Sequence, residues 1–212
     1  MTAFLFVIST ILGINNAYHY FDRPEAYDHQ CNVMDYGAKG DGKTNDTSSI
    51  QKAIDDCLGK GSSAQIVLPE SKTFLVGPLS LTKKCENCAF TIEKDATLLV
   101  SNDRSKWPTN VDFLTINDLD KFVFEGPGII EGQGLVWWQN RNDFRPRIMN
   151  AHSCNGVVVT DVTIRNCPNH CLEMYTDSTE ISNIEIYNPP SELKNSDQES
   201  HTTGLYIHLT LI

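Results

Sequence analysis

Asp161-Val-Thr-Ile-Arg-Asn166 is repeated as Asn183-Ile-Glu-Ile-Tyr-Asn188, and the second copy begins 22 residues after the first. Both copies alternate polar with apolar residues, which is typical of short β-strands. No helical pattern separates them. A repeat of this length is typical of a solenoid, in which each repeat stacks on the one before it. The two copies therefore predict a fold of stacked β-coils.

Short alternating runs extend this pattern over most of the chain. They are separated by Gly, Asn, Asp, Ser and Pro, which favour tight turns. An antiparallel sandwich would also space its strands closely, but it does not explain copies at long period. The runs cover residues 65–68, 73–76, 90–92, 97–100, 113–116, 121–124, 147–149, 157–164, 172–175 and 181–187.

Asparagine is suited to the corners of such coils, because it tolerates the left-handed backbone conformation. It can also stack its amide on the coil above. The candidate corner residues are Asn150, Asn155, Asn166, Asn183 and Asn188.

One segment, residues 48–58, has helical periodicity instead. Apolar residues recur there at i, i+3, i+4, i+7 and i+8, which predicts one buried helix face. Asp46 or Thr47 can cap its start, and Gly59 can end it. The expected fold is thus all-β, a parallel solenoid with a short N-terminal capping helix.

The first residues predict export from the cell. An apolar run at residues 3–14 is too short to span a bilayer, which takes about 20 residues. The small residue Ala17 follows it, so residues 1–17 are expected to be a secretory signal peptide. A buried N-terminal strand is the alternative. In a secreted chain, Asn45-Asp-Thr47 would be a glycosylation sequon with Asn45 as the acceptor.

Secretion also favours disulfides among the seven cysteines, and their odd number leaves at least one unpaired. We expect a Cys31–Cys57 disulfide, because it would join the first strand to the buried face of the helix. Local bonds between Cys85 and Cys88, and between Cys167 and Cys171, are further candidates. A zinc site would need a second compact pair, which the sequence lacks, so no metal is expected.

Composition excludes some partners. The chain has 212 residues, of which 40% are hydrophobic and 21% charged, as in globular proteins. Lys and Arg number 17 against 27 Asp and Glu, giving a net charge of −10. This balance disfavours nucleic acid or an anionic membrane as a partner. An acidic polymer could still bind in a locally basic groove.

Two segments together resemble a known family. The first segment is Val33-Met-Asp-Tyr-Gly-Ala-Lys-Gly-Asp-Gly-Lys-Thr-Asn-Asp-Thr47. The second is Gly126-Pro-Gly-Ile-Ile-Glu-Gly-Gln-Gly-Leu-Val-Trp-Trp138, which is followed by Arg145-Pro-Arg147. In this order the segments are similar to the polygalacturonases, glycoside hydrolase family twenty-eight. The resemblance implies a right-handed parallel β-helix over residues 31–212. It also implies a secreted, cell-wall-directed monomer that hydrolyses the α-1,4-galacturonan of pectin without a cofactor. Trp137 and Trp138 are expected to pack on the solenoid from a turn.

The chemistry of that family requires groups that this sequence lacks. An inverting glycosidase needs two positioned carboxyl groups, and an acidic substrate needs Lys or Arg. The family supplies them as Asn-Thr-Asp, Asp-Asp, Gly-His-Gly and Arg-Ile-Lys on consecutive coils. The sequence contains no such series. Its nearest counterpart to the first motif, Ser200-His-Thr-Thr-Gly204, lacks the aspartate.

We therefore assign no catalytic residue and expect a chain that is truncated at its C-terminus and catalytically incomplete. A non-catalytic, secreted pectin-binding module is the alternative. A polysaccharide lyase would need calcium-binding acid clusters, which are not evident. Arg145 and Arg147 could touch substrate, although packing between coils or simple exposure fits them better. Other polar residues are expected at the surface: Glu173, Asp177, Glu185, Asp197, Glu199, His201 and His208.

Overall fold

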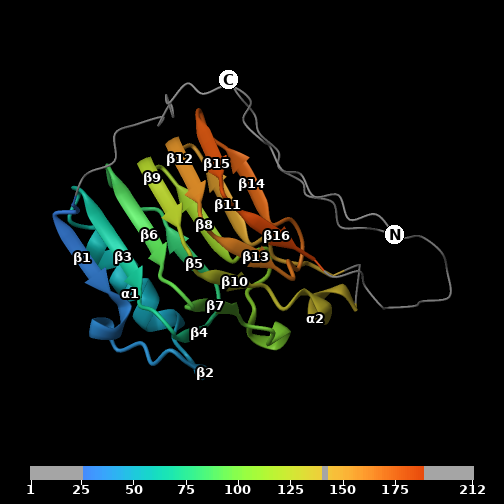
Figure 1. Cartoon of the computed structure of the whole chain (residues 1–212). Coiled ribbons are helices and arrows are strands. Elements are labelled where there is room, and N and C mark those ends of the chain that lie inside the picture. Colours follow the sequence, from blue (N-terminus) through green and yellow to red (C-terminus); the bar gives the residue numbers. More distant parts are fainter. Residues whose placement is uncertain (1–25, 140–142, 189–212) are drawn as a thin grey trace.

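The computed structural model describes residues 26–139 and 143–188. They form a right-handed parallel β-helix of three parallel sheets (Figure 1). Each complete coil places one strand in sheet A, one in sheet B and one in sheet C. The solenoid expected from the repeat is thus confirmed.

The strands stack in order along the three sheets. Sheet A contains β1 (His29–Asn32), β3 (Ala64–Leu68), β6 (Cys88–Ile92), β9 (Asp120–Glu125), β12 (Asn155–Thr160) and β15 (Thr179–Ser182). Sheet B contains β2 (Asp41–Asn45), β4 (Thr73–Val76), β7 (Thr97–Val100), β10 (Ile129–Glu131), β13 (Thr163–Arg165) and β16 (Glu185–Tyr187). Sheet C contains β5 (Leu79–Leu81), β8 (Leu114–Asn117), β11 (Met149–His152) and β14 (Leu172–Tyr175).

The core runs through the middle of the coils as ladders of apolar side chains in register. Ile66 pairs with Phe90, Phe90 with Phe124, and Phe124 with Val159, and all four are fully buried. The rings of Phe90 and Phe124 stack with centroids 5.2 Å apart. The alternation read from the sequence is therefore the alternation between core and surface.

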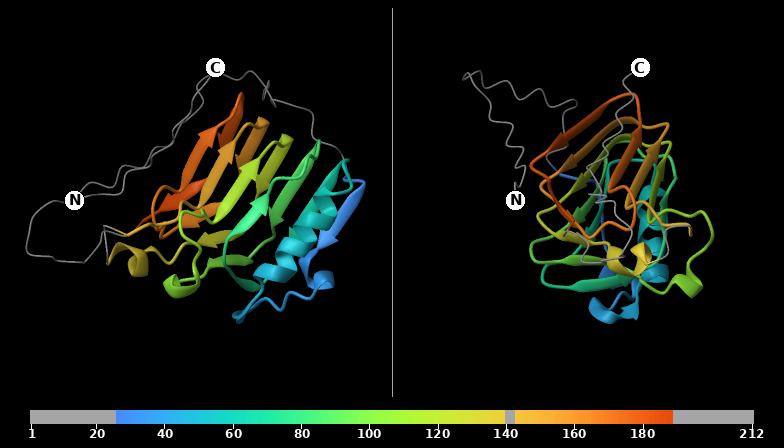
Figure 2. Two further views of the ribbon diagram at one scale, coloured as in Figure 1. Left: turned by 180° about the vertical axis from the view of Figure 1, so that it is seen from behind. Right: turned by 90° about the vertical axis from the view of Figure 1, so that its right-hand side faces the viewer.

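Helix α1 (Thr47–Leu58) covers the N-terminal end of the stack (Figure 2). Its apolar positions are buried as expected, and Gly59 occupies the C-cap position. The prediction that a side chain of Asp46 or Thr47 caps the helix is wrong, however. Asp46 is the N-cap residue, but its carboxylate accepts hydrogen bonds from the backbone N–H groups of Lys39 (2.7 Å) and Gly40 (3.0 Å) instead.

The corner asparagines were predicted correctly in part. Asn166 and Asn183 adopt the left-handed conformation, with φ of 53° and 50°. Asn188 links two coils, because its side chain accepts a hydrogen bond from the backbone N–H of Cys167. Asn150 and Asn155 lie inside strands β11 and β12, so their assignment to corners is wrong.

Two expected runs each contain a corner. Residues 157–164 divide into β12 and β13 around Asp161, whose φ is 57°, and Asn183 divides β15 from β16. The first strand, expected at Cys31, is β1, whereas the three short strands β2, β5 and β10 were not expected.

The segment before Arg145 also differs from expectation. Residues Gly134–Trp138 form a short helix, α2, where we expected a turn. The tryptophans do pack on the solenoid. Trp137 is buried against Trp107, with centroids 5.1 Å apart, and Trp138 donates to the backbone carbonyls of Cys167 and Pro168.

The expected signal peptide, residues 1–17, lies outside the described residues. Within the part of the chain that is described, no helix is long and apolar enough to cross a membrane.

Candidate functional site

The outer face of sheet C gathers polar and aromatic side chains into two rows. Interior positions of its strands carry Leu114, Met149 and Leu172, so the alternate residues face outward. In register, one outward row is formed by Thr115, Asn150 and Glu173, and the other by Asn117, His152 and Tyr175.

Arg147 lies at the centre of an ionic cluster that joins three consecutive coils. Its Nη2 is 3.0 Å from Oδ2 of Asp112, and its Nη1 is 2.5 Å from Oε1 of Glu173. Its backbone N–H also donates to Asp112, at 2.9 Å. Asn150 donates to the same carboxylate at 2.7 Å, and Nδ1 of His170 is 3.1 Å from Oε2 of Glu173. The cluster therefore holds the coils together at the start of the sheet C strands.

Both carboxylates of this cluster are buried. Asp112 is 6% exposed and Glu173 is 8% exposed. Burial alone would raise the pKa of Glu173, but hydrogen bonds from Arg147, His170 and Tyr175 outweigh it and lower that pKa to about 2. Glu173 is consequently ionised at pH 4 and above.

This geometry decides what the two acids can do. A general acid must hold a proton to donate to the leaving oxygen, and an ionised Glu173 has none. A general base needs a free oxygen toward water, but both carboxylates are occupied by Arg147 and its neighbours. The cluster is suited to positioning the coils rather than to acid–base catalysis.

The second row ends in an aromatic pair. His152 and Tyr175 are register partners on β11 and β14, and their rings stack with centroids 4.6 Å apart and planes 17° apart. Tyr175 is 39% exposed, so part of its ring is accessible to a ligand. The pair places two aromatic side chains at the C-terminal ends of these strands, with one face of each ring covered by the other ring.

The structure places the residues considered from the sequence as follows. Arg147 packs between coils, as we favoured. Arg145 is half-exposed, and its carbonyl accepts from Asn169. Glu173 points outward but is buried beside Arg147, whereas Asp177 is exposed as expected, in the turn after β14. Asp197, Glu199, His201 and His208 lie outside the described residues.

The disulfide and glycosylation candidates occupy the N-terminal coils. Cys31 in β1 is bonded to Cys57 in α1, with Cα atoms 6.0 Å apart, which is ordinary for a disulfide. Cys85–Cys88 and Cys167–Cys171 are also bonded, and Cys154 is a buried free thiol. Asn45 is exposed in β2. Within residues 26–139 and 143–188, no group of three His, Cys, Asp or Glu side chains could hold a metal ion.

Sequence reasoning missed Asp112 and Asn150 as members of the cluster. Asp112 is 35 residues from Arg147, whereas Glu173 is 26 residues from it. These separations do not follow one period, because loops of different length connect the strands. A period of 22 residues therefore does not align these positions.

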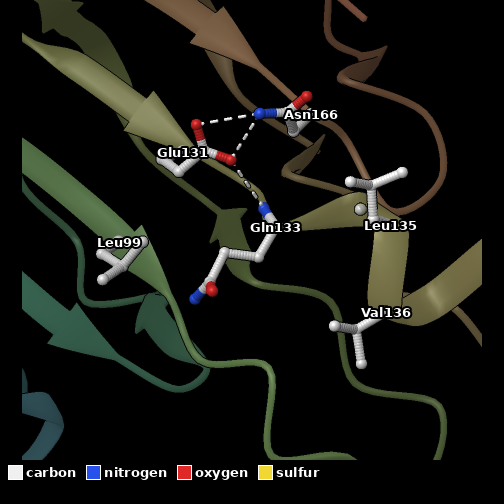
Figure 3. A pocket seen from close by; sticks show the side chains of 7 residues that line it. Leu99, Glu131, Gln133, Leu135, Val136 and Asn166 are labelled. Atoms are coloured by element: carbon white, nitrogen blue, oxygen red, sulfur yellow. Dashed lines mark hydrogen bonds between the residues drawn. The ribbon is translucent and has the colours of Figure 1, made fainter. Parts of the chain in front are cut away.

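A pocket of about 330 Å³ lies between sheet B and α2 (Figure 3). Glu131 forms its polar wall and accepts hydrogen bonds from Asn166 at 2.8 and 3.0 Å and from the backbone of Gln133 at 3.0 Å. Nε of Arg165 is 2.8 Å from the same carboxylate. The acid thus organises a corner of sheet B, and we do not assign a reaction to this pocket.

The fold places the chain among the parallel β-helix proteins, and the outer face of sheet C is its best candidate for binding a ligand. The family model for the glycosyl hydrolases family 28 matches residues 57–212, and the chain belongs to that family.

Relatives of known class agree with this assignment. A probable polygalacturonase of Arabidopsis thaliana is 30% identical over 78% of this chain, and a polygalacturonase of Juniperus ashei is 30% identical over 78%. These matches cover 36% and 34% of the two relatives, so the chain spans about a third of their length.

Among solved structures, an exopolygalacturonase of Thermotoga maritima matches 79% of this chain with a TM-score of 0.66 and 20% identity. The polygalacturonase of Erwinia carotovora matches 82% with a TM-score of 0.64 and 22% identity. These two structures support the β-helix fold.

Proposed function

We propose that this chain is a polygalacturonase-like protein that binds the α-1,4-galacturonan of pectin on the outer face of sheet C but does not hydrolyse it. Family membership supports the class of substrate, because the polygalacturonases among its relatives are named for galacturonan. We further propose that residues 31–212 form one β-helix domain, and that the chain acts outside the cell as a monomer after loss of residues 1–17.

The proposed absence of hydrolysis rests on one observation: Glu173 and Asp112 are both held in ion pairs with Arg147. Glu173 lies on the outer face of sheet C, Asp112 precedes strand β8 of that sheet, and Arg147 binds both of these buried acids. Inversion needs one protonated carboxyl group and one free carboxylate on opposite sides of the sugar. A pair tied by a single guanidinium supplies neither. The family motifs that would supply them are absent from the sequence.

The chain can be tested directly for hydrolysis. Residues 18–212 are purified and incubated with polygalacturonate at pH 4 to 6, and new reducing ends are measured. We expect a rate at least about a hundredfold below that of an intact family member, since general acid–base catalysis contributes about 10²–10⁴-fold. Turnover within a hundredfold of that enzyme would contradict the proposal.

A variant of Glu173 tests whether this residue is responsible for any hydrolysis that is found. Glu173→Gln removes the ionised carboxylate without changing its size. If turnover occurs and this variant abolishes it, Glu173 takes part in the chemistry after all. Retention of galacturonan on a column of immobilised chain, without product, is the outcome that the proposal predicts.

A further inference from the structure

The His152–Tyr175 pair and the ionic cluster share one face but differ in chemistry. Arg145 and Arg147 both precede β11, whereas His152 and Tyr175 end β11 and β14. An extended chain rises about 3.3 Å per residue, so the ring pair lies toward the opposite end of the strands from the backbone of the two arginines. A polysaccharide lying across sheet C would meet the two ends with different sugar units or different edges.

The surroundings of the ring pair are negatively charged. Arg147 carries one positive charge and binds two carboxylates, so that group has a net negative charge. Asp118 and Asp177 are exposed in the turns that follow β8 and β14. The backbone N–H of Asp118 donates to the carbonyl of His152, which places the main chain of Asp118 next to that of His152.

The pKa of the Tyr175 hydroxyl is affected by this negative charge. A hydrogen bond to the Glu173 carboxylate, and the charge of that carboxylate, raise the pKa of the Tyr175 hydroxyl even though Arg147 acts in the other direction. The Glu173 carboxylate therefore lies against the hydroxyl edge of the ring. A free uronate placed there would be repelled, whereas an uncharged sugar would not.

We infer that the His152–Tyr175 pair binds a methyl-esterified, uncharged galacturonosyl unit in preference to a free galacturonate. The exposed part of the Tyr175 ring, which His152 supports from the other side, offers apolar surface to the C–H face of the sugar and to the ester methyl group. The surrounding acids disfavour the carboxylate form. This inference rests on the proposed binding of pectin and names the form of pectin that the face selects.

Binding to two pectic polymers tests the selection. The full chain without residues 1–17 is titrated at pH 7 with unesterified polygalacturonate and with highly methyl-esterified homogalacturonan of matched length. We expect the esterified polymer to bind at least about fivefold more tightly, which corresponds to one good aromatic contact. Equal affinity, or tighter binding of the unesterified polymer, would overturn the inference and leave the proposed function standing. Binding of neither polymer would overturn both.

Variants distinguish the contribution of the Tyr175 ring to binding from the contribution of the negative charge. Tyr175→Ala should weaken esterified binding about fivefold and change unesterified binding by less than twofold, while Tyr175→Phe should retain the preference. Glu173→Gln removes one negative charge and should strengthen unesterified binding about threefold or more. Glu185→Gln, the same change at an exposed position of sheet B, is the matched control and should change neither affinity.

Tyr175 and Glu185 are exposed, so substitutions there should leave the fold intact. If Glu173→Gln fails to fold, Asp118→Asn removes a charge from the exposed turn next to His152 and replaces it in the test. An unchanged ratio of affinities in both the charge variants and Tyr175→Ala would contradict the inference.

Discussion

Arg147 and Glu173 form an ion pair of 2.5 Å between neighbouring coils, and the same arginine binds Asp112 on the coil before. Three coils are thereby joined through one guanidinium. Because both acids are buried, they depend on Arg147 for compensation of their charge.

Loss of Arg147 should therefore destabilise the protein markedly. Arg147→Ala leaves two buried carboxylates without their cation, and we expect the free energy of unfolding to fall by about 2–4 kcal/mol. Urea unfolding followed by circular dichroism measures this change. Arg165→Ala is the control, because the Arg165–Glu131 pair is more exposed and should contribute only about 0–1 kcal/mol. Equal losses in the two variants would contradict a special role of Arg147.

The low pKa of Glu173 predicts a dependence of stability on pH. Folding lowers this pKa from 4.5 to about 2. The folded state binds the proton more weakly than the unfolded state does, so the stabilisation is fully present above about pH 4.5 and is lost as the pH falls toward 2.

Glu173→Gln removes this titration. The difference in the free energy of unfolding between the native chain and this variant should shrink by about 1–3 kcal/mol between pH 6 and pH 2.5. Denaturant unfolding of both proteins across this range measures it. A difference that does not vary with pH would show that Glu173 titrates normally.

The Cys31–Cys57 disulfide should stabilise the fold more than the local disulfides do. It closes a loop of 26 residues, against 4 for Cys167–Cys171. Loop entropy predicts losses of about 3.5 and 2 kcal/mol for the corresponding double serine variants. Thermal unfolding compares them, and peptide mapping should find Cys154 as the free thiol. A smaller loss for the Cys31/Cys57 variant would contradict this ranking.

Secretion is open to a separate test. When the full chain is expressed in eukaryotic cells, we expect cleavage after Ala17 and a glycan on Asn45, which is exposed. Mass spectrometry of the medium detects both, and Asn45→Gln should remove only the glycan mass. Retention of the uncleaved chain inside the cells would contradict the signal peptide.

The fold could be predicted from the sequence because every coil of a solenoid packs in the same way and therefore needs a similar pattern of residues. Every coil needs the same alternation of core and surface residues, so the copies at residues 161 and 183 carry the architecture. Corners were harder to place, since Asn166 uses the left-handed backbone while Asn150 uses its side chain to bind Asp112. Amino-acid type alone does not separate these roles.

The candidate site was less predictable for a related reason. Arg147 was singled out by its sequence context, but its partners depend on which residues the coils bring into register. Met149 pairs with Leu114 on one side and with Leu172 on the other, across connections of different length. The stacking of His152 on Tyr175 follows from the same register and leaves no local signal in the sequence.

Chemical-shift mapping with an unlabelled, partly methyl-esterified oligogalacturonide tests the central claim most directly. The isotope-labelled chain is titrated, and amide shifts are followed across the three sheets. We predict shifts concentrated on β8, β11 and β14 and on the turns that follow them, with His152 and Tyr175 among the largest, and no new reducing ends during the titration. Shifts confined to sheet A or sheet B, or cleavage of the oligomer at a rate typical of the family, would contradict the account.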